Sequence, residues 1–236
     1  MEAALYLIPV ALGETPLEQV LPPYNHDIII GIRHFIVENV RSARRFLRKV
    51  DKAVDIDALT FYELSEHTDV TKIGSYLAPL EHGEPMGVIS EAGCPAVADP
   101  GADVVRMAQE RGLPVVPLVG PSSIILAVMG SGFNGQSFAF NGYLPVKDSE
   151  RASRIRQLEN RAWNESQTQL FIEAPYRNIQ MFGTILSSCR KDTRLCVAAG
   201  ITCQGEFIRT HTIAEWRKLS VPDINKVPAI FLLYRG

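Results

Sequence analysis

Residues 86–112 read MGVISEAGCPAVADPGADVVRMAQERG, and this stretch holds a strand, a loop and a helix in that order. The apolar run at 86–90 predicts a buried strand, and residues 102–111 predict a helix that Gly112 ends. The loop between them, residues 91–101, is rich in glycine, proline and other small residues. A strand that leads through a loop into a helix is the repeating unit of a parallel α/β sheet.

The same alternation continues on both sides of this stretch. In the first half we expect further strands at 4–10, 27–32, 59–62 and 115–119, with helices at 35–50, 70–80 and 124–129. In the second half we expect strands at 137–143, 169–173, 195–201, 206–212 and 228–234, with helices at 150–163 and 178–188. The short connection at 202–205 indicates an antiparallel hairpin. We therefore predict two α/β domains, residues 1–133 with a mostly parallel sheet and residues 134–236 with a mixed sheet.

The composition is that of an ordinary globular protein, with 46% hydrophobic and 21% charged residues. A net charge of −2 argues against a dedicated polyanion-binding protein, although it allows a local basic patch. The four cysteines form no C-x-x-C pair, which argues against a zinc site. No apolar run approaches the ~20 residues of a membrane span, and the N-terminal residues do not form a signal peptide. We expect a cytoplasmic protein with no bound metal and no membrane partner.

Three loops of the first half are candidates for a ligand site: residues 9–13, 91–101 and 120–123. In open α/β sheets ligands collect at the carboxyl ends of the strands, where these loops are expected to lie. Glycine lets a ligand approach the backbone closely, and proline fixes the path of the chain. Any one of the loops has the composition of an ordinary turn, but their presence at one edge favours a binding function. The loops contain no P-loop, G-x-G-x-x-G or G-x-S-x-G motif, so mononucleotide, dinucleotide and serine-hydrolase sites lack support.

These loops carry a family resemblance. Residues 90–101 (SEAGCPAVADPG) and 119–123 (VGPSS) resemble the S-D-A-G-x-P-x-x-x-D-P-G and G-P-[CS]-[AS] motifs of the tetrapyrrole (corrin/porphyrin) methylase family. In the second half, residues 142–147 (GYLPVK) with Arg151, and residues 171–177 (FIEAPYR), resemble motifs of its RNA branch, ribosomal RNA small subunit methyltransferase I. That branch methylates the ribose 2′-hydroxyl of a cytidine. The resemblance covers essentially the whole chain.

The resemblance implies an S-adenosylmethionine (SAM)-dependent methyltransferase that releases S-adenosyl-L-homocysteine. It implies that SAM lies in the cleft between two α/β domains, that the protein works as a homodimer, and that its partner is ribosomal RNA or the small ribosomal subunit. Carried over position by position, it implies cofactor contacts at Pro9, Leu12, Gly93, Cys94, Val97, Ser122, Ser123, Ile172, Ala198, Ala199, Pro228 and Ala229.

A ribose hydroxyl is a poor nucleophile, so a general base would help its methylation. The candidates are Glu91, Asp99 and Glu38, and Asp99 has the alternative role of capping the helix that follows it.

The expected substrate contacts are Arg41, His67, Lys147, Arg151 and Arg177. Arg41 opens a basic run at 41–49, which tracks RNA phosphates in one interpretation and is an ordinary solvated helix face in the other.

The chain departs from the RNA branch mainly on the substrate side. It has VENVR at 37–41 where the branch has A-E-D-T-R, and AAGIT at 198–202 where the branch has A-R-E-L-T. Two alternatives to methylation of ribosomal RNA therefore stay open. One is SAM-dependent methylation of a tetrapyrrole or another small molecule, and the other is a ribosome-associated protein that binds SAM without catalysis.

Overall fold

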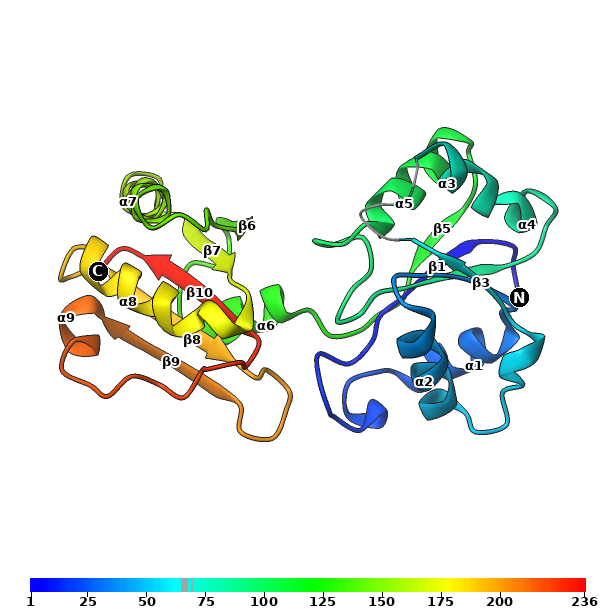
Figure 1. Cartoon of the computed structure of the whole chain (residues 1–236), viewed down its shortest axis with the longest axis horizontal. Helices are drawn as coiled ribbons and strands as arrows, with labels where there is room; N and C mark the ends of the chain where they lie inside the picture. Colours follow the sequence, from blue (N-terminus) through cyan, green and yellow to red (C-terminus); the bar gives the residue numbers. More distant parts are fainter. Residues whose placement is uncertain (65–67, 69) are drawn as a thin grey trace. The chain divides into compact units, whose positions relative to one another are not determined.

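The computed structural model describes residues 1–64, 68 and 70–236. The chain divides into two compact units, residues 1–122 and 123–236, and each has its own five-stranded sheet (Figure 1). The division falls before the boundary expected between 133 and 134, because α6 (Ser123–Ser131) contacts β8, β9 and β10 of the second unit.

The sheet of the first unit is entirely parallel, in the order β3-β2-β4-β1-β5. Its strands are β1 (Leu5–Ile8), β2 (His34–Val37), β3 (Thr60–Glu63), β4 (Met86–Ile89) and β5 (Val115–Pro117). β1 and β4 are buried throughout, as expected for central strands covered on both faces.

Helices cover both faces of this sheet (Figure 1). They are α1 (Pro23–Gly31), α2 (Val40–Val50), α3 (Val70–Tyr76), α4 (Ala78–Glu81) and α5 (Gly101–Glu110), with short 3₁₀ turns at Leu17–Gln19 and Ile56–Ala58. Side chains of α1 and α2 pack with Tyr6, Ile8 and Phe35, whereas those of α3, α4 and α5 pack with Leu7 and Ile36. The sheet therefore presents its carboxyl edge, and not its faces, to a ligand.

The strand expected at 27–32 is wrong, because these residues belong to α1 and the turn that ends it. Pro23 is the first residue of α1, where its fixed φ and missing N–H are tolerated, and this start signal outweighs the run of isoleucines. The strand follows instead as β2. The helix expected at 35–50 consequently shortens to α2, whose first turn is capped by the Asn39 side chain accepting from the N–H of Ser42 at 3.0 Å.

The second unit has a mixed sheet in the order β6-β7-β10-β8-β9, in which β6 and β7 are parallel and the other pairs antiparallel. Its strands are β6 (Phe138–Tyr143), β7 (Thr168–Ile172), β8 (Arg194–Ala199), β9 (Phe207–Thr212) and β10 (Ala229–Tyr234). β8 and β9 form the antiparallel hairpin expected from the short connection between them. The predicted fold class, a parallel and a mixed α/β sheet, is confirmed.

Besides α6, the second unit contains α7 (Asp148–Asn164), α8 (Asn178–Ser188), α9 (Ile213–Trp216) and a 3₁₀ turn at Pro175–Arg177. Side chains of α7, α8 and α9 share a core with Phe171, Val197 and Phe231 of the sheet. Among the described residues, no helix is both long and apolar enough to cross a membrane.

Candidate functional site

The three loops singled out in the first half meet at the carboxyl edge of the parallel sheet. Val10 and Gly93 exchange backbone hydrogen bonds of 2.9 and 3.2 Å, which join the first loop to the second. The thiol of Cys94 donates to the carbonyl of Pro121 at 3.4 Å, which joins the second loop to the third. Burial raises the pKa of the Cys94 thiol, so this side chain fills the loop and is not an activated nucleophile.

Gly93 is required at this junction for two reasons. Its φ of +72° lies in the left-handed region that favours glycine. A Cβ at this position would also lie 3.1 Å from Cδ2 of Leu12 and 3.4 Å from the carbonyl oxygen of Pro121. The backbone of the second loop is thus held against the first and third loops with no side chain between them.

Asp99 closes the second loop onto α5. Its carboxylate accepts from the N–H of Gly101 at 2.6 Å and from the N–H of Ala96 at 2.9 and 3.0 Å. Burial raises the pKa of Asp99, although these backbone hydrogen bonds oppose the shift. This geometry favours the capping role over the general-base role that the sequence also allowed.

Glu38 and Glu91, the other two acidic candidates, adjoin each other at the ends of β2 and β4. Oε1 of Glu38 accepts from the backbone N–H of Glu91 at 3.1 Å. Glu91 is exposed, so its carboxylate can reach a ligand, while Glu38 fixes the backbone that carries it. Both residues were predicted from the sequence as candidate general bases, and the structure places them next to each other.

A hollow of about 290 Å³ lies between the first loop, the start of the second loop and α2. This volume is near the lower end of the range typical of small-molecule sites. Its lining includes Leu12 and Glu91 of the expected site, and the cations Arg45 and Lys49 of α2. The expected cofactor residues Gly93, Cys94 and Val97 are not part of this lining.

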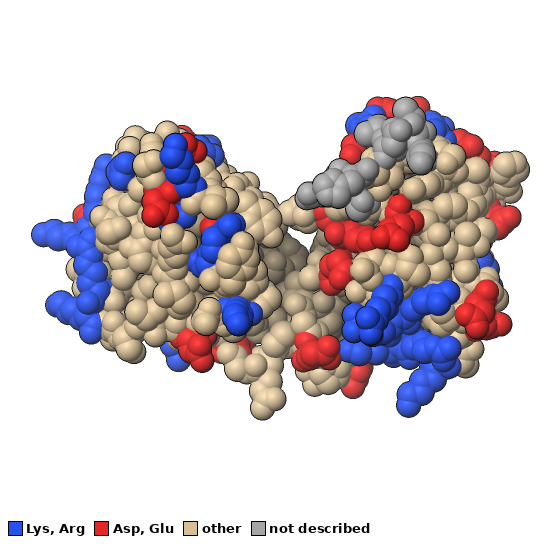
Figure 2. Space-filling view, viewed as in Figure 1, with Lys and Arg blue, Asp and Glu red and all other residues tan. Residues whose placement is uncertain are grey.

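Arg45 and Lys49 were noted in the sequence only as members of the basic run. Their spacing of four residues places them on one face of α2, and that spacing is the signal that could have identified them. The lining of a second hollow on the same helix includes Arg41, Arg44, Arg45 and Arg48. Figure 2 shows the resulting concentration of cationic side chains over α2.

In the second unit, the expected cofactor residues gather in neighbouring strands. Ala229 pairs with Ala199, and Ile230 pairs with both Ala198 and Ile172. Ala198, Ala199 and Ala229 are buried, Pro228 is exposed, and Ile172 is half-buried at the end of β7. The resemblance thus selects one continuous patch at one end of this sheet.

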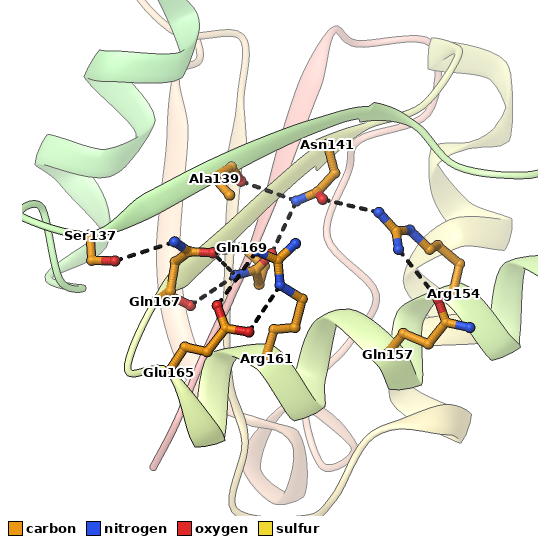
Figure 3. A network of polar contacts seen from close by, with 9 residues as sticks. All are labelled: Ser137, Ala139, Asn141, Arg154, Gln157, Arg161, Glu165, Gln167 and Gln169. Atoms are coloured by element: carbon orange, nitrogen blue, oxygen red, sulfur yellow. Dashed lines mark hydrogen bonds and ion pairs between the residues drawn. The ribbon is translucent and has the colours of Figure 1, made fainter.

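Arg151 and Arg154 of the second unit are held inside their own unit. Arg151 is 1% exposed, and its guanidinium donates to Val146, Asp148 and Thr184, so burial favours a structural role over the expected RNA contact. Arg154 donates to Asn141 and Gln157 in a polar network between α7 and the edge of the sheet (Figure 3). Lys147 is exposed and pairs with Glu150 at 3.1 Å.

The network in Figure 3 centres on Gln169, which is fully buried in β7. Its amide nitrogen donates to Oε1 of Gln167 at 2.9 Å, and its amide oxygen accepts from Asn141 at 3.2 Å. The amide of Gln169 finds its hydrogen-bond partners within the unit. Its burial therefore needs no bound ligand to explain it.

Arg177 follows β7 and is anchored by Glu173, whose Oε1 accepts from it at 2.6 Å. Val97, an expected cofactor residue in the middle of the second loop, is 50% exposed, and Ser123 at the end of the third loop is the first residue of α6. His67 lies outside the residues that the structure describes.

No family model matches the chain. It is similar to proteins named ribosomal RNA small subunit methyltransferase I from several bacteria. The match to the Pseudomonas aeruginosa protein has 32% identity over 161 residues, covering 68% of this chain and 56% of that protein. The Xylella fastidiosa protein is 30% identical over 214 residues, covering 90% of this chain and 75% of that protein. The Vibrio cholerae protein is 27% identical over 237 residues, covering 98% of this chain and 77% of that protein.

Two solved structures share the fold. The methyltransferase CobJ matches with a TM-score of 0.64 and 11% identity, over 99% of this chain and 94% of that chain. The uroporphyrin-III-C-methyltransferase from Thermus thermophilus matches with a TM-score of 0.54 and 16% identity, over 100% of this chain and 93% of that chain.

The match to the Pseudomonas relative spans little more than half of that protein's length.

Proposed function

The chain belongs to the family of ribosomal RNA small subunit methyltransferase I, and on that premise we propose that it transfers a methyl group from SAM to a ribose 2′-hydroxyl of small-subunit ribosomal RNA. The observation that carries the proposal is the meeting of the three motif-bearing loops at one sheet edge, beside a hollow that presents the exposed carboxylate of Glu91 and two cations, one of which pairs with Glu14. We place this activity in the cytoplasm and in a homodimer, as the resemblance implies.

The loops of the first unit fit SAM as a ligand. Gly93 is buried, and a Cβ there would meet Leu12 and Pro121, so its bare backbone lets the three loops pack together at this edge. We propose that Pro9, Leu12, Gly93, Cys94, Val97 and Ser122 hold SAM through backbone groups and small apolar side chains. SAM supplies an electrophilic methyl group on a sulfonium, and the enzyme then contributes mainly by orienting the acceptor.

The hollow beside these loops fits the acceptor strand of RNA. Arg45 is an exposed cation that can bind a phosphate, whereas Lys49 is exposed but pairs with Glu14 at 3.0 Å. Glu91 is an exposed carboxylate that can take the proton of the attacking hydroxyl. Glu38 positions Glu91 through the 3.1 Å hydrogen bond to its backbone N–H. Asp99 keeps the second loop folded and does not touch the acceptor in this scheme.

A cationic helix beside the hollow favours a polyanion over a tetrapyrrole or another small molecule as the methyl acceptor. The test is transfer of a labelled methyl group from SAM into a lysate that lacks this gene, followed by separation of ribosomal RNA, protein and small molecules. We expect label in small-subunit RNA. Label in the small-molecule fraction would favour the tetrapyrrole alternative, and SAM binding without label anywhere would favour a non-catalytic protein.

The same assay tests the site with a matched pair of glycine variants. Gly93→Ala and Gly112→Ala both place alanine at a positive φ, +72° and +68°, so both carry similar backbone strain. An added Cβ meets Leu12 and Pro121 at position 93 and nothing within 4 Å at position 112. We expect Gly93→Ala to lose SAM affinity and methyl transfer while Gly112→Ala keeps both. Equal effects of the two variants would show that the loops are not the cofactor site.

A further inference from the structure

Two exposed tyrosines flank Arg177 in the second unit. Tyr143 is the last residue of β6 and pairs with Ile172, the last residue of β7. The chain then turns through Glu173 into the 3₁₀ turn that carries Tyr176 and Arg177. Tyr143 is 64% exposed and Tyr176 is 66% exposed, so both rings are accessible to a ligand.

Arg177 is held in place by Glu173 and Tyr176. Its Nη2 donates to Oε1 of Glu173 at 2.6 Å, and the Glu173 side chain is fully buried. The same oxygen accepts from the N–H of Ala174 at 2.7 Å, which fixes the carboxylate. The guanidinium carbon lies 5.2 Å from the centre of the Tyr176 ring, and Nη1 donates to its hydroxyl at 3.3 Å. The pKa of Arg177 is raised, chiefly by its hydrogen bond to Glu173, with smaller contributions from the phenols of Tyr176 and Tyr143, so the group stays charged.

This arrangement places two exposed aromatic side chains and one preorganised guanidinium at the carboxyl ends of the neighbouring parallel strands β6 and β7. Aromatic side chains and arginine planes are the groups on which proteins stack unpaired nucleobases, and arginine also pairs with phosphate. The backbone N–H of Lys226, an exposed lysine, donates to the carbonyl of Pro175 at the start of the turn and ties the turn to the chain before β10. Side chains fixed before binding lose little entropy when a ligand arrives.

We propose that Tyr143, Tyr176 and Arg177 form a stacking platform for an unpaired base of the RNA substrate. The proposal deepens the proposed function and rests on its assignment of RNA as the acceptor. Bases inside an A-form duplex hide their faces, so the platform selects single-stranded or extruded nucleotides. It thereby adds a specificity element that lies on a different unit from the three loops.

The test measures the affinity of the full chain for a fluorescently labelled single-stranded RNA oligonucleotide by anisotropy. We expect Tyr176→Ala and Tyr143→Ala each to weaken binding about tenfold, and Tyr176→Phe to stay within about twofold because it keeps the ring. Tyr176→Leu keeps apolar bulk without the ring and should behave like the alanine variant. Tyr24→Ala is the matched control, because Tyr24 is 63% exposed on α1 of the other unit.

The outcomes separate the platform from the methylation reaction. RNA affinity of Tyr143→Ala and Tyr176→Ala equal to that of the parent, with methyl transfer into RNA intact, would overturn the platform and leave the proposed function standing. Loss of RNA affinity in these variants, with no methyl transfer by the parent protein, would support the platform and overturn the proposed function. Where both hold, the variants should raise the KM for RNA about tenfold and leave SAM affinity by calorimetry unchanged.

Discussion

Asp99 shows how one carboxylate can serve structure in a position that suggests catalysis. It accepts hydrogen bonds from the N–H groups of Ala96 and Gly101, and so joins the two ends of a strained turn. Ala96 and Ala98 both have positive φ, 64° and 60°, which is uncommon for residues with a Cβ. The carboxylate therefore stabilises a backbone path that the chain would otherwise avoid.

A pair of substitutions tests the role of Asp99. Asp99→Asn keeps an acceptor oxygen for both N–H groups, whereas Asp99→Ala removes it. We expect the alanine variant to be about 1–2 kcal/mol less stable than the asparagine variant in urea unfolding. Methyl transfer by Asp99→Asn should stay close to that of the parent. A folded Asp99→Asn protein without activity would instead show that Asp99 is the general base.

The pH dependence of stability follows from the same group. Burial raises the pKa of Asp99 above its unfolded value of about 3.9. The stability that it contributes is therefore complete below about pH 3.9 and is lost as the pH rises through the folded-state pKa. Asparagine does not titrate, so Asp99→Asn should gain stability relative to the parent between about pH 4 and pH 7. Urea unfolding at a series of pH values measures this difference in the free energy of unfolding. A parent protein that becomes more stable relative to the variant as the pH rises would contradict the prediction.

At the scale of elements, α2 is the helix on which the proposed RNA contact depends. Ala43, Phe46 and Leu47 bury one face of it against the sheet. The opposite face carries arginines, and Arg45 lines both of the hollows described beside this helix. The helix therefore presents its charges in a fixed row beside the loops.

RNA binding should depend on salt through this row. We expect Arg45→Gln and Arg48→Gln each to reduce the slope of log affinity against log salt concentration by about 0.7, the value for one contact to a single strand. The control is Arg106→Gln, because Arg106 is already paired with Glu110 at 2.9 Å and with Asp103 on α5. A series of anisotropy titrations at rising salt measures the slopes. Equal slopes for the α2 variants and for Arg106→Gln would show that the arginines of α2 are solvated and do not contact RNA.

The elements that could be predicted are those with one dominant signal. The strand at Met86–Ile89 follows from a short apolar run that a loop rich in glycine and proline ends, and the helix at Asn178–Ser188 follows from apolar periodicity. The strand predicted at 27–32 was wrong because a run of isoleucines has no period that distinguishes a strand from a helix. The prolines before the run favour the start of a helix. The capping box of Thr212 and Glu215 on α9 is a local signal that periodicity does not register in so short a helix.

Some features of the candidate site could be predicted from local sequence, and others depend on tertiary contacts. The three loops could be located because strand ends in a parallel sheet share one edge. The burial of Arg151 and the network around Gln169 could not, because both depend on which residues of α7 and the neighbouring strands face each other. Charge in a sequence says nothing of whether a partner inside the fold already neutralises it.

At the scale of the whole molecule, the chain is two units with separate cores. Each unit has a complete sheet and is within the range of about 50–250 residues in which domains fold alone. α6 belongs to the second core: a Cβ at Gly130 would lie 3.0 Å from Ile208, and the carbonyl of Ser131 accepts from Thr210 at 2.8 Å. The ring of Phe133 lies 5.5 Å from that of Tyr234, which extends the same contact to the end of β10.

This assignment predicts where the chain can be divided. A fragment of residues 123–236 keeps α6 on its sheet, whereas a fragment of residues 134–236 exposes the apolar surface of β8, β9 and β10 that α6 covers. We therefore expect the longer fragment to unfold cooperatively in urea and the shorter one to unfold at lower urea concentration or to aggregate. Residues 1–122 should fold alone as well, because β5 and its hydrogen bonds to β1 lie within them. Equal stability of the two C-terminal fragments would place α6 in the linker and return the domain boundary to residues 133 and 134.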